Sequence, residues 1–168
     1  MPFLSPTETC PSCGAATAPS TSGATHRYLE SSPGCWAAYG EVLAREYADP
    51  AYFAVHALTV DAYSVQHPGR PGPQTIASIH LHLASLYAHL KRGSPVAELA
   101  AVKQRVAAFK AEFEWIDPPE HFGGLTVADV LKASSASEHV EAVTEWATTA
   151  FMAWSEAHTR MEAWLRRL

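Results

Sequence analysis

Three cysteines and one histidine near the start of the chain have the types and order expected of metal ligands: Cys10, Cys13, His26 and Cys35. Thiolate sulfur and imidazole nitrogen are preferred donors for zinc, and four of them in a tetrahedron form the usual structural zinc site. Sequence order favours His26 as the fourth ligand, although His67 or His56 could fold back to fill this position. We therefore predict a Zn²⁺ cofactor bound by a Cys3His set.

The residues around these cysteines suit metal binding. Two residues separate the first two cysteines and Gly14 follows them, which permits a tight turn that aims both sulfurs at one point. Ser32 is typical of an N-cap and Pro33 of a first helical position, so we expect Cys35 in the first turn of a helix. The helix dipole there favours a thiolate. Because four protein ligands leave no open position for water, the metal is predicted to be structural.

Two other roles for the cysteines are less compatible with their surroundings. A thioredoxin-like redox motif needs a strand before its Cys-x-x-Cys pair, and residues 1–9 show no strand pattern. An extracellular disulfide framework needs paired cysteines, whereas this chain has 3, and residues 1–4 lack the basic and apolar regions of a signal peptide. We therefore expect a protein of the reducing cytoplasm.

Composition limits the classes of partner. The chain has 168 residues, of which 48% are hydrophobic, and this is enough for one compact domain with a sizeable core. Its net charge is -5, with only 12 Lys plus Arg, which argues against nucleic acid or an anionic membrane surface as a partner. An unknown small molecule or protein partner remains open, and so does the choice between monomer and homodimer.

Apolar periodicity predicts helices along most of the chain, and no alternating pattern long enough for a sheet. The ranges expected to be helical are 33–47, 51–66, 73–91, 95–115, a short helix opened by a capping box at Thr126–Asp129, and a long helix at 137–165. The five tryptophans are expected to serve as core packing. The predicted fold is all-α: an antiparallel bundle of five to six helices over residues 36–168, preceded by an irregular zinc-binding segment over residues 1–35.

One face of the helix predicted at 51–66 carries an unusual number of polar groups. His56, Tyr63 and His67 fall on one stripe, with Gln66 on its flank. Polar side chains are costly to bury without partners, so this face either is wet or lines a polar pocket. Asp61 points about 140° away from His56, which places it outside that cluster. His56 taken alone is equally compatible with a core histidine that bonds a carbonyl group.

A second hypothesis makes the protein a small metal-dependent hydrolase or transferase. In it, His56, His67 and one later histidine or carboxylate bind a metal that keeps one exchangeable position. The candidate catalytic residues are then His56, Asp61, Tyr63, Gln66 and His67. We favour the structural zinc site because thiolate-rich ligand sets with this spacing are usually closed. A set of the three cysteines with His67 is an intermediate possibility.

Several strings in the chain resemble a family of bacterial proteins catalogued as a domain of unknown function. They are Cys-x-x-Cys-Gly at 10–14, His-Arg-Tyr at 26–28, Ser-Pro-Gly-Cys-Trp at 32–36, Val-Asp-Ala-Tyr-Ser-Val-Gln-His-Pro-Gly at 60–69 and Leu-Thr-Val-Ala-Asp-Val at 125–130. The resemblance implies a single small, mostly helical domain and suggests that His56, Asp61, Gln66 and His67 matter as a group. It implies no particular activity.

Overall fold

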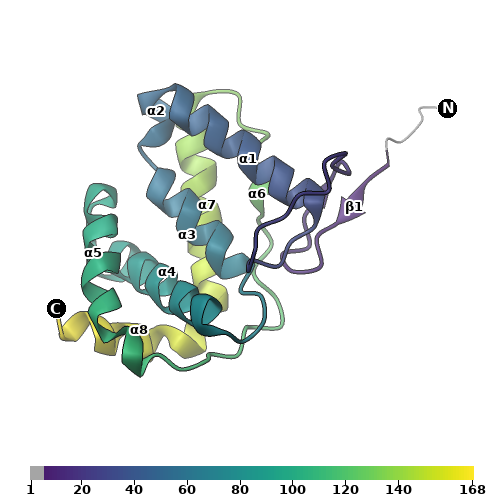
Figure 1. Cartoon of the computed structure of the whole chain (residues 1–168). Coiled ribbons are helices and arrows are strands. Elements are labelled where there is room, and N and C mark those ends of the chain that lie inside the picture. Colours follow the sequence, from purple (N-terminus) through teal and green to yellow (C-terminus); the bar gives the residue numbers. More distant parts are fainter. Residues whose placement is uncertain (1–5) are drawn as a thin grey trace.

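The computed structural model describes residues 6–168, so the expectation that residues 1–4 are no signal peptide lies outside the described residues. The all-α prediction is confirmed: helices make up most of the described chain (Figure 1). The α-helices of this part are α1 (Pro33–Ala48), α2 (Pro50–Phe53), α3 (His56–Gln66), α4 (Pro73–Arg92), α5 (Leu99–Val106), α6 (Val127–Val130), α7 (Ala136–Ala153) and α8 (His158–Arg166). None of them is long and apolar enough to cross a membrane.

Local sequence signals explain where several helices begin and end. The Ser32 side chain accepts a hydrogen bond from the Cys35 N–H and caps α1, as predicted. The Thr126–Asp129 capping box at the start of α6 is confirmed. Helix α4 ends at Gly93, whose φ of 72° is readily adopted only by glycine.

Three of the predicted helices are wrong in extent. The range 95–115 is α-helical only over α5, with short 3-10 helices on either side at Val96–Glu98 and Ala107–Glu112. The other two predicted helices are broken. The range 51–66 divides into α2 and α3 at Ala54 and Val55, and α2 packs on α1 and α7. The range 137–165 divides at Trp154 into α7, which packs on α3, and α8, which packs on α4. Neither break contains glycine or proline, the residues that usually mark the end of a helix, and the apolar periodicity continues through both breaks. The sequence pattern therefore could not reveal them. Each break instead lets the two shorter helices pack against different neighbouring helices.

A small β-hairpin precedes the helices. Strands β1 (Glu8–Thr9) and β2 (Ala16–Thr17) pair antiparallel, with Glu8 opposite Thr17. The expectation of no strand in residues 1–9 is therefore wrong at positions 8 and 9, since two residues are too few to show alternation. The turn contains both cysteines of the Cys-x-x-Cys pair and closes with a hydrogen bond from Gly14 N–H to the Cys10 carbonyl.

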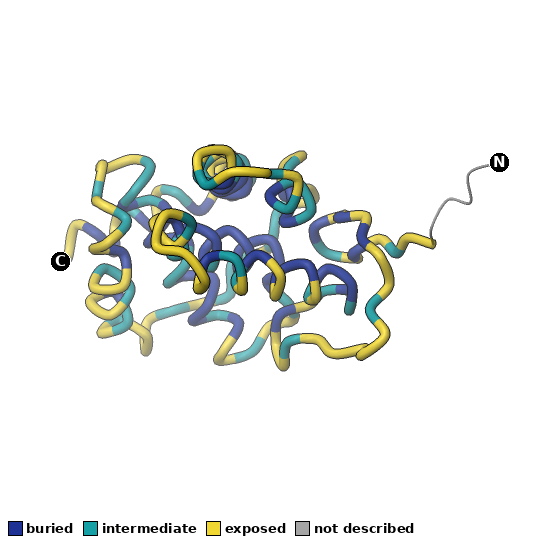
Figure 2. The backbone as a smooth tube through the Cα atoms, turned by 90° about the horizontal axis from the view of Figure 1, so that it is seen from above, coloured by how far each residue is buried: buried dark blue, intermediate teal, exposed yellow. Residues whose placement is uncertain are grey.

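The core lies where α3, α4 and α7 meet, and buried backbone runs through the middle of the molecule in Figure 2. Its largest fully buried side chains include Trp146, Phe151, Leu83 and Leu86. Trp154 and Trp164 are also buried, which agrees with the prediction that tryptophans serve in packing. Figure 1 shows the hairpin at one end of the bundle, beside the start of α1.

Candidate metal centre

Four potential metal ligands from three separate elements meet at this end of the bundle. Cys10 and Cys13 lie in the hairpin turn, Cys35 in the first turn of α1, and His67 directly after α3. One donor atom from each lies within 4.8 Å of the others. All four residues are buried, with exposed fractions of 1%, 9%, 0% and 0% in sequence order. Three thiols and one imidazole thus face one another away from solvent.

The separations between these donors suit a tetrahedral ion. Zn–S bonds of about 2.3 Å and Zn–N bonds of about 2.0–2.1 Å place two sulfurs about 3.8 Å apart and a sulfur and nitrogen about 3.5–3.6 Å apart. The Cys13 and Cys35 sulfurs are 3.7 Å apart. His67 Nε2 lies 3.6 Å from Cys10 Sγ and 3.4 Å from Cys35 Sγ. The four side chains therefore fit a zinc-sized cation, and the three cysteines are free of disulfides.

The thiols themselves favour a cation at this position. Hydrogen bonds from the Cys13 and Cys35 side chains hold the pKa of Cys10 far below its ordinary value. The same contact with Cys10 raises the pKa of Cys13 to about 12, and contacts with Cys10 and Cys13 raise the pKa of Cys35 further. The three sulfurs can thus all be thiolates only if a cation balances their charge, and metal binding must release protons.

The orientation of His67 also suits a metal ligand. Its Nδ1 lies 2.7 Å from the carbonyl oxygen of Tyr63. Because a carbonyl oxygen can only accept, Nδ1 carries a proton, and Nε2 is the ring nitrogen that faces the sulfurs. Metal-binding histidines are usually oriented by such a bond at the other ring nitrogen. His67 is the C-cap of α3, directly after the predicted end of this helix at Gln66.

His26, the first choice as fourth ligand, lies elsewhere. Its Nδ1 accepts hydrogen bonds from the backbone N–H groups of Tyr28 and Leu29, at 3.3 and 3.2 Å. Its ring packs edge-on against Trp36, and burial lowers its pKa. The nitrogen beside the sulfurs belongs to His67, the alternative that the sequence left open. The separation of 57 residues from Cys10 explains why spacing could not identify it.

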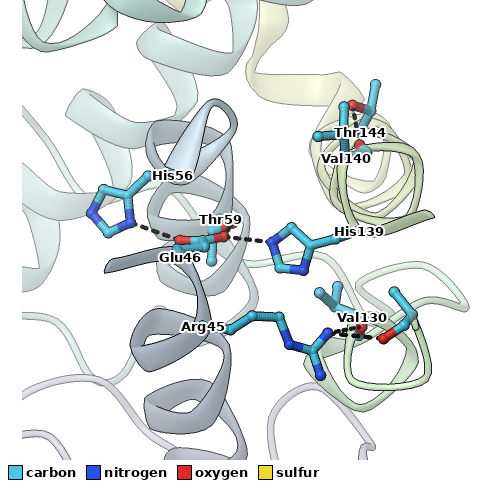
Figure 3. A network of polar contacts seen from close by, with 9 residues as sticks. Arg45, Glu46, His56, Thr59, Val130, His139, Val140 and Thr144 are labelled. Atoms are coloured by element: carbon cyan, nitrogen blue, oxygen red, sulfur yellow. Dashed lines mark hydrogen bonds and ion pairs between the residues drawn. The ribbon is translucent and has the colours of Figure 1, made fainter. Parts of the chain in front are cut away.

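His56 faces a buried carboxylate instead of the cysteines. Its Nδ1 lies 2.7 Å from Glu46, which also accepts hydrogen bonds from Thr59 and, at 3.0 Å, from Nε2 of His139. Figure 3 shows the two imidazoles on opposite sides of this carboxylate. Glu46 is not among the candidate residues predicted from the sequence, yet it lies seven residues after Tyr39, which places both on the same buried face of α1.

Asp61 forms a second buried cluster, away from His56 as its helical angle predicted. Its carboxylate accepts hydrogen bonds from His82 Nδ1 and Lys103 Nζ, both at 2.6 Å, and from the Ser85 hydroxyl. Burial raises the pKa of Asp61, but the hydrogen bond from His82 and the charge of Lys103 outweigh it, so the pKa lies below its ordinary value.

The Gln66 side chain forms hydrogen bonds that hold the core together. Its amide NH₂ donates to the carbonyl oxygens of Phe122 and Leu125, and its Oε1 accepts from the Trp146 indole. These bonds join the end of α3 to α7 and to the loop before α6. This buried amide thus holds distant parts of the core together.

The five candidate catalytic residues therefore do not line a common pocket. His56 and His67 lie at opposite ends of α3, about 16 Å apart along the helix axis, and cannot share an ion. A cavity of about 410 Å³ beside Gly69 is lined by Arg27, Arg70 and neighbouring residues, not by these histidines. Within residues 6–168, the sole cluster with metal-ligand geometry is the Cys3His group. The two-histidine metal site of the enzyme hypothesis is thus not formed.

Comparison with curated proteins and with solved structures finds no match for the chain. A family model does match, over residues 8–155, and this range contains all four members of the Cys3His group. The match covers most of the helical bundle as well as the hairpin. The chain therefore belongs to the family described as a family of unknown function, DUF5946.

Proposed function

We propose that this is a zinc-binding helical protein in which one Zn²⁺, held by Cys10, Cys13, Cys35 and His67, is structural. The observation that carries the proposal is the convergence of four buried donor atoms at separations typical of a tetrahedral zinc site. When bound, the metal supplies positive charge and a fixed geometry for three thiolates and one imidazole.

The donor set favours zinc over other common ions. Thiolates select soft or borderline metals, whereas calcium and magnesium take oxygen donors. No carboxylate belongs to the cluster found among the described residues. Four protein donors fill a tetrahedral zinc ion, so no position is left for a catalytic water molecule.

The site would join three parts of the chain that are distant from one another in sequence. The hairpin supplies two ligands, the start of α1 one and the end of α3 the fourth. Two polar contacts reinforce the same junction: the Glu8 carboxylate accepts from the Gly34 N–H at the start of α1, and the Ser12 hydroxyl donates to the Gln66 carbonyl at 2.7 Å. Metal binding energy here would act as folding energy for the N-terminal segment.

Two further proposals follow from this chemistry. Reduced thiols are required as ligands, so we place the protein in the cytoplasm. The net charge of -5 supports a partner other than nucleic acid or an anionic membrane.

Elemental analysis and X-ray absorption spectroscopy of the natively purified chain test the metal site. We expect one zinc per chain, with three sulfur ligands and one nitrogen ligand. Cys13→Ser and His67→Ala should each lose most of the metal, whereas the control His26→Ala should retain it, because His26 bonds only backbone amides. A metal-free native protein, or a metal with nitrogen and oxygen ligands that survives Cys13→Ser, would overturn the proposal.

A further inference from the structure

Tyr63 contacts the candidate metal centre without belonging to its ligands. Its hydroxyl oxygen lies 3.6 Å from Cys35 Sγ, and its side chain is fully buried. Its backbone carbonyl oxygen accepts the hydrogen bond from His67 Nδ1. One residue on α3 is therefore in contact with two of the four ligands.

Packing fixes the position of this hydroxyl. The Tyr63 ring stacks on the His67 ring and on the Tyr39 ring, each with a centroid separation of 3.9 Å. Aromatic side chains have few rotatable bonds, and the stack restrains them further. The hydroxyl therefore stays beside the sulfur.

The direction of the contact follows from the chemistry of the two groups. A metal-bound cysteine is a thiolate without a proton, so its sulfur can only accept a hydrogen bond. The tyrosine hydroxyl carries a proton that it can donate. In the loaded protein, Tyr63 must be the donor and the Cys35 sulfur the acceptor.

We propose that Tyr63 is a positioning residue of the metal centre, whose hydroxyl donates a hydrogen bond to the Cys35 thiolate and thereby increases metal affinity. The inference rests on the proposed zinc function. Zn²⁺ with three thiolates has a net charge of -1, which is costly to bury without compensation. A hydrogen bond to one sulfur offsets part of that charge, as outer partners of metal ligands commonly do.

The test compares Tyr63→Phe with the wild-type full chain and with the matched control Tyr39→Phe. The control removes a hydroxyl from the ring stacked on Tyr63 and leaves the contact to sulfur intact. Metal affinity is measured by competition with a chromophoric chelator, and sulfur electron density by the thiolate-to-metal charge-transfer band of the Co²⁺-loaded proteins.

We expect Tyr63→Phe to bind zinc about tenfold more weakly. Its charge-transfer band should shift to lower energy, because the sulfur loses a hydrogen-bond donor. Tyr39→Phe should match the wild type in both measurements. Wild-type affinity and an unshifted band in Tyr63→Phe, or equal changes in both variants, would overturn the inference. A wild-type protein without any cobalt–thiolate band would instead overturn the proposed metal site.

A second measurement needs no variant and so does not depend on the folding of Tyr63→Phe. In wild-type protein loaded with ¹¹³Cd²⁺, the Tyr63 hydroxyl proton should exchange slowly with solvent and show scalar coupling to the metal through the Cys35 sulfur. A hydroxyl proton in fast exchange, without this coupling, would contradict the hydrogen bond.

Discussion

The segment over residues 6–32 and the helical bundle are held in place by different interactions. The bundle packs large apolar side chains against one another, including those of Trp146, Phe151 and Leu83. The segment has few buried side chains, and these are mostly small: Cys10, Cys13, Ala15, Thr17, Leu29 and Ser32. Two of its four buried apolar residues are candidate metal ligands.

This difference shows how a segment with little apolar surface can be ordered. Burial of a large apolar side chain contributes about 1.5–3 kcal/mol to stability. The segment has almost no side chains of this kind. Structural zinc contributes about 10–16 kcal/mol in small peptides, which would offset a substantial part of the about 1–2 kcal/mol per residue that ordering the backbone costs. We therefore expect the bundle to fold through its core, and the segment to depend on metal.

The largest effect should follow removal of the metal by a chelator. Protease cleavage within residues 14–32 should become faster by about tenfold or more, because the segment loses its main attachment. The helical circular dichroism signal of the bundle should change little. Limited proteolysis followed by mass spectrometry would locate the cuts, and unchanged resistance after verified metal removal would contradict the comparison.

A substitution inside the bundle should lower the stability of the bundle and leave the metal site unchanged. Asp61→Asn removes the charge that pairs with His82 and Lys103 in a buried position. We expect a loss of about 3–5 kcal/mol in the free energy of unfolding, with the metal content unchanged. Chemical denaturation would measure the loss. Glu162→Gln is the matched control, since its exposed pair with Arg166 should be worth about 1 kcal/mol or less.

The same carboxylate predicts a pH dependence of bundle stability. The pKa of Asp61 is lower in the folded protein than in the unfolded chain, so the unfolded chain takes up the proton first as the pH falls. Its stabilising contribution is present above about pH 4, near the ordinary aspartate pKa, and is lost as the pH falls through the folded pKa. The stability difference between wild type and Asp61→Asn should therefore shrink below about pH 4 in denaturation curves. A constant difference down to acid would argue against this assignment.

A smaller effect should follow at the contact between the segment and the bundle. Gly69 has a φ of 68°, and a Cβ there would lie 2.3 Å from the Tyr28 carbonyl oxygen. Gly69→Ala should therefore cost about 1–3 kcal/mol and weaken metal binding by pushing the two loops apart. Gly124→Ala is the control, because a Cβ at Gly124 meets no atom within 4 Å. Equal melting temperatures for the two variants would show that the close approach of Gly69 to Tyr28 does not affect stability.

Much of the fold could be predicted from local patterns. The Ser32-Pro33 start of α1, the apolar stripe of α4 and the capping box at Thr126 are each signals within a few residues, and the structure has each of these helices. The breaks at Val55 and Trp154 could not be predicted, because they serve contacts with helices distant in sequence.

The chain alone shows the chemistry of the candidate site: three cysteines, a tight turn for two of them and a helix start for the third. Which histidine joins them depends on the path of the whole chain, because His26 and His67 carry the same imidazole and differ only in where packing places it. Likewise, Glu46 and Asp61 acquire their partners from α7, α4 and α5 only after the helices pack. The sequence sets which metal-binding and hydrogen-bonding side chains are available. The close packing of helices that are distant in sequence decides which of these side chains meet.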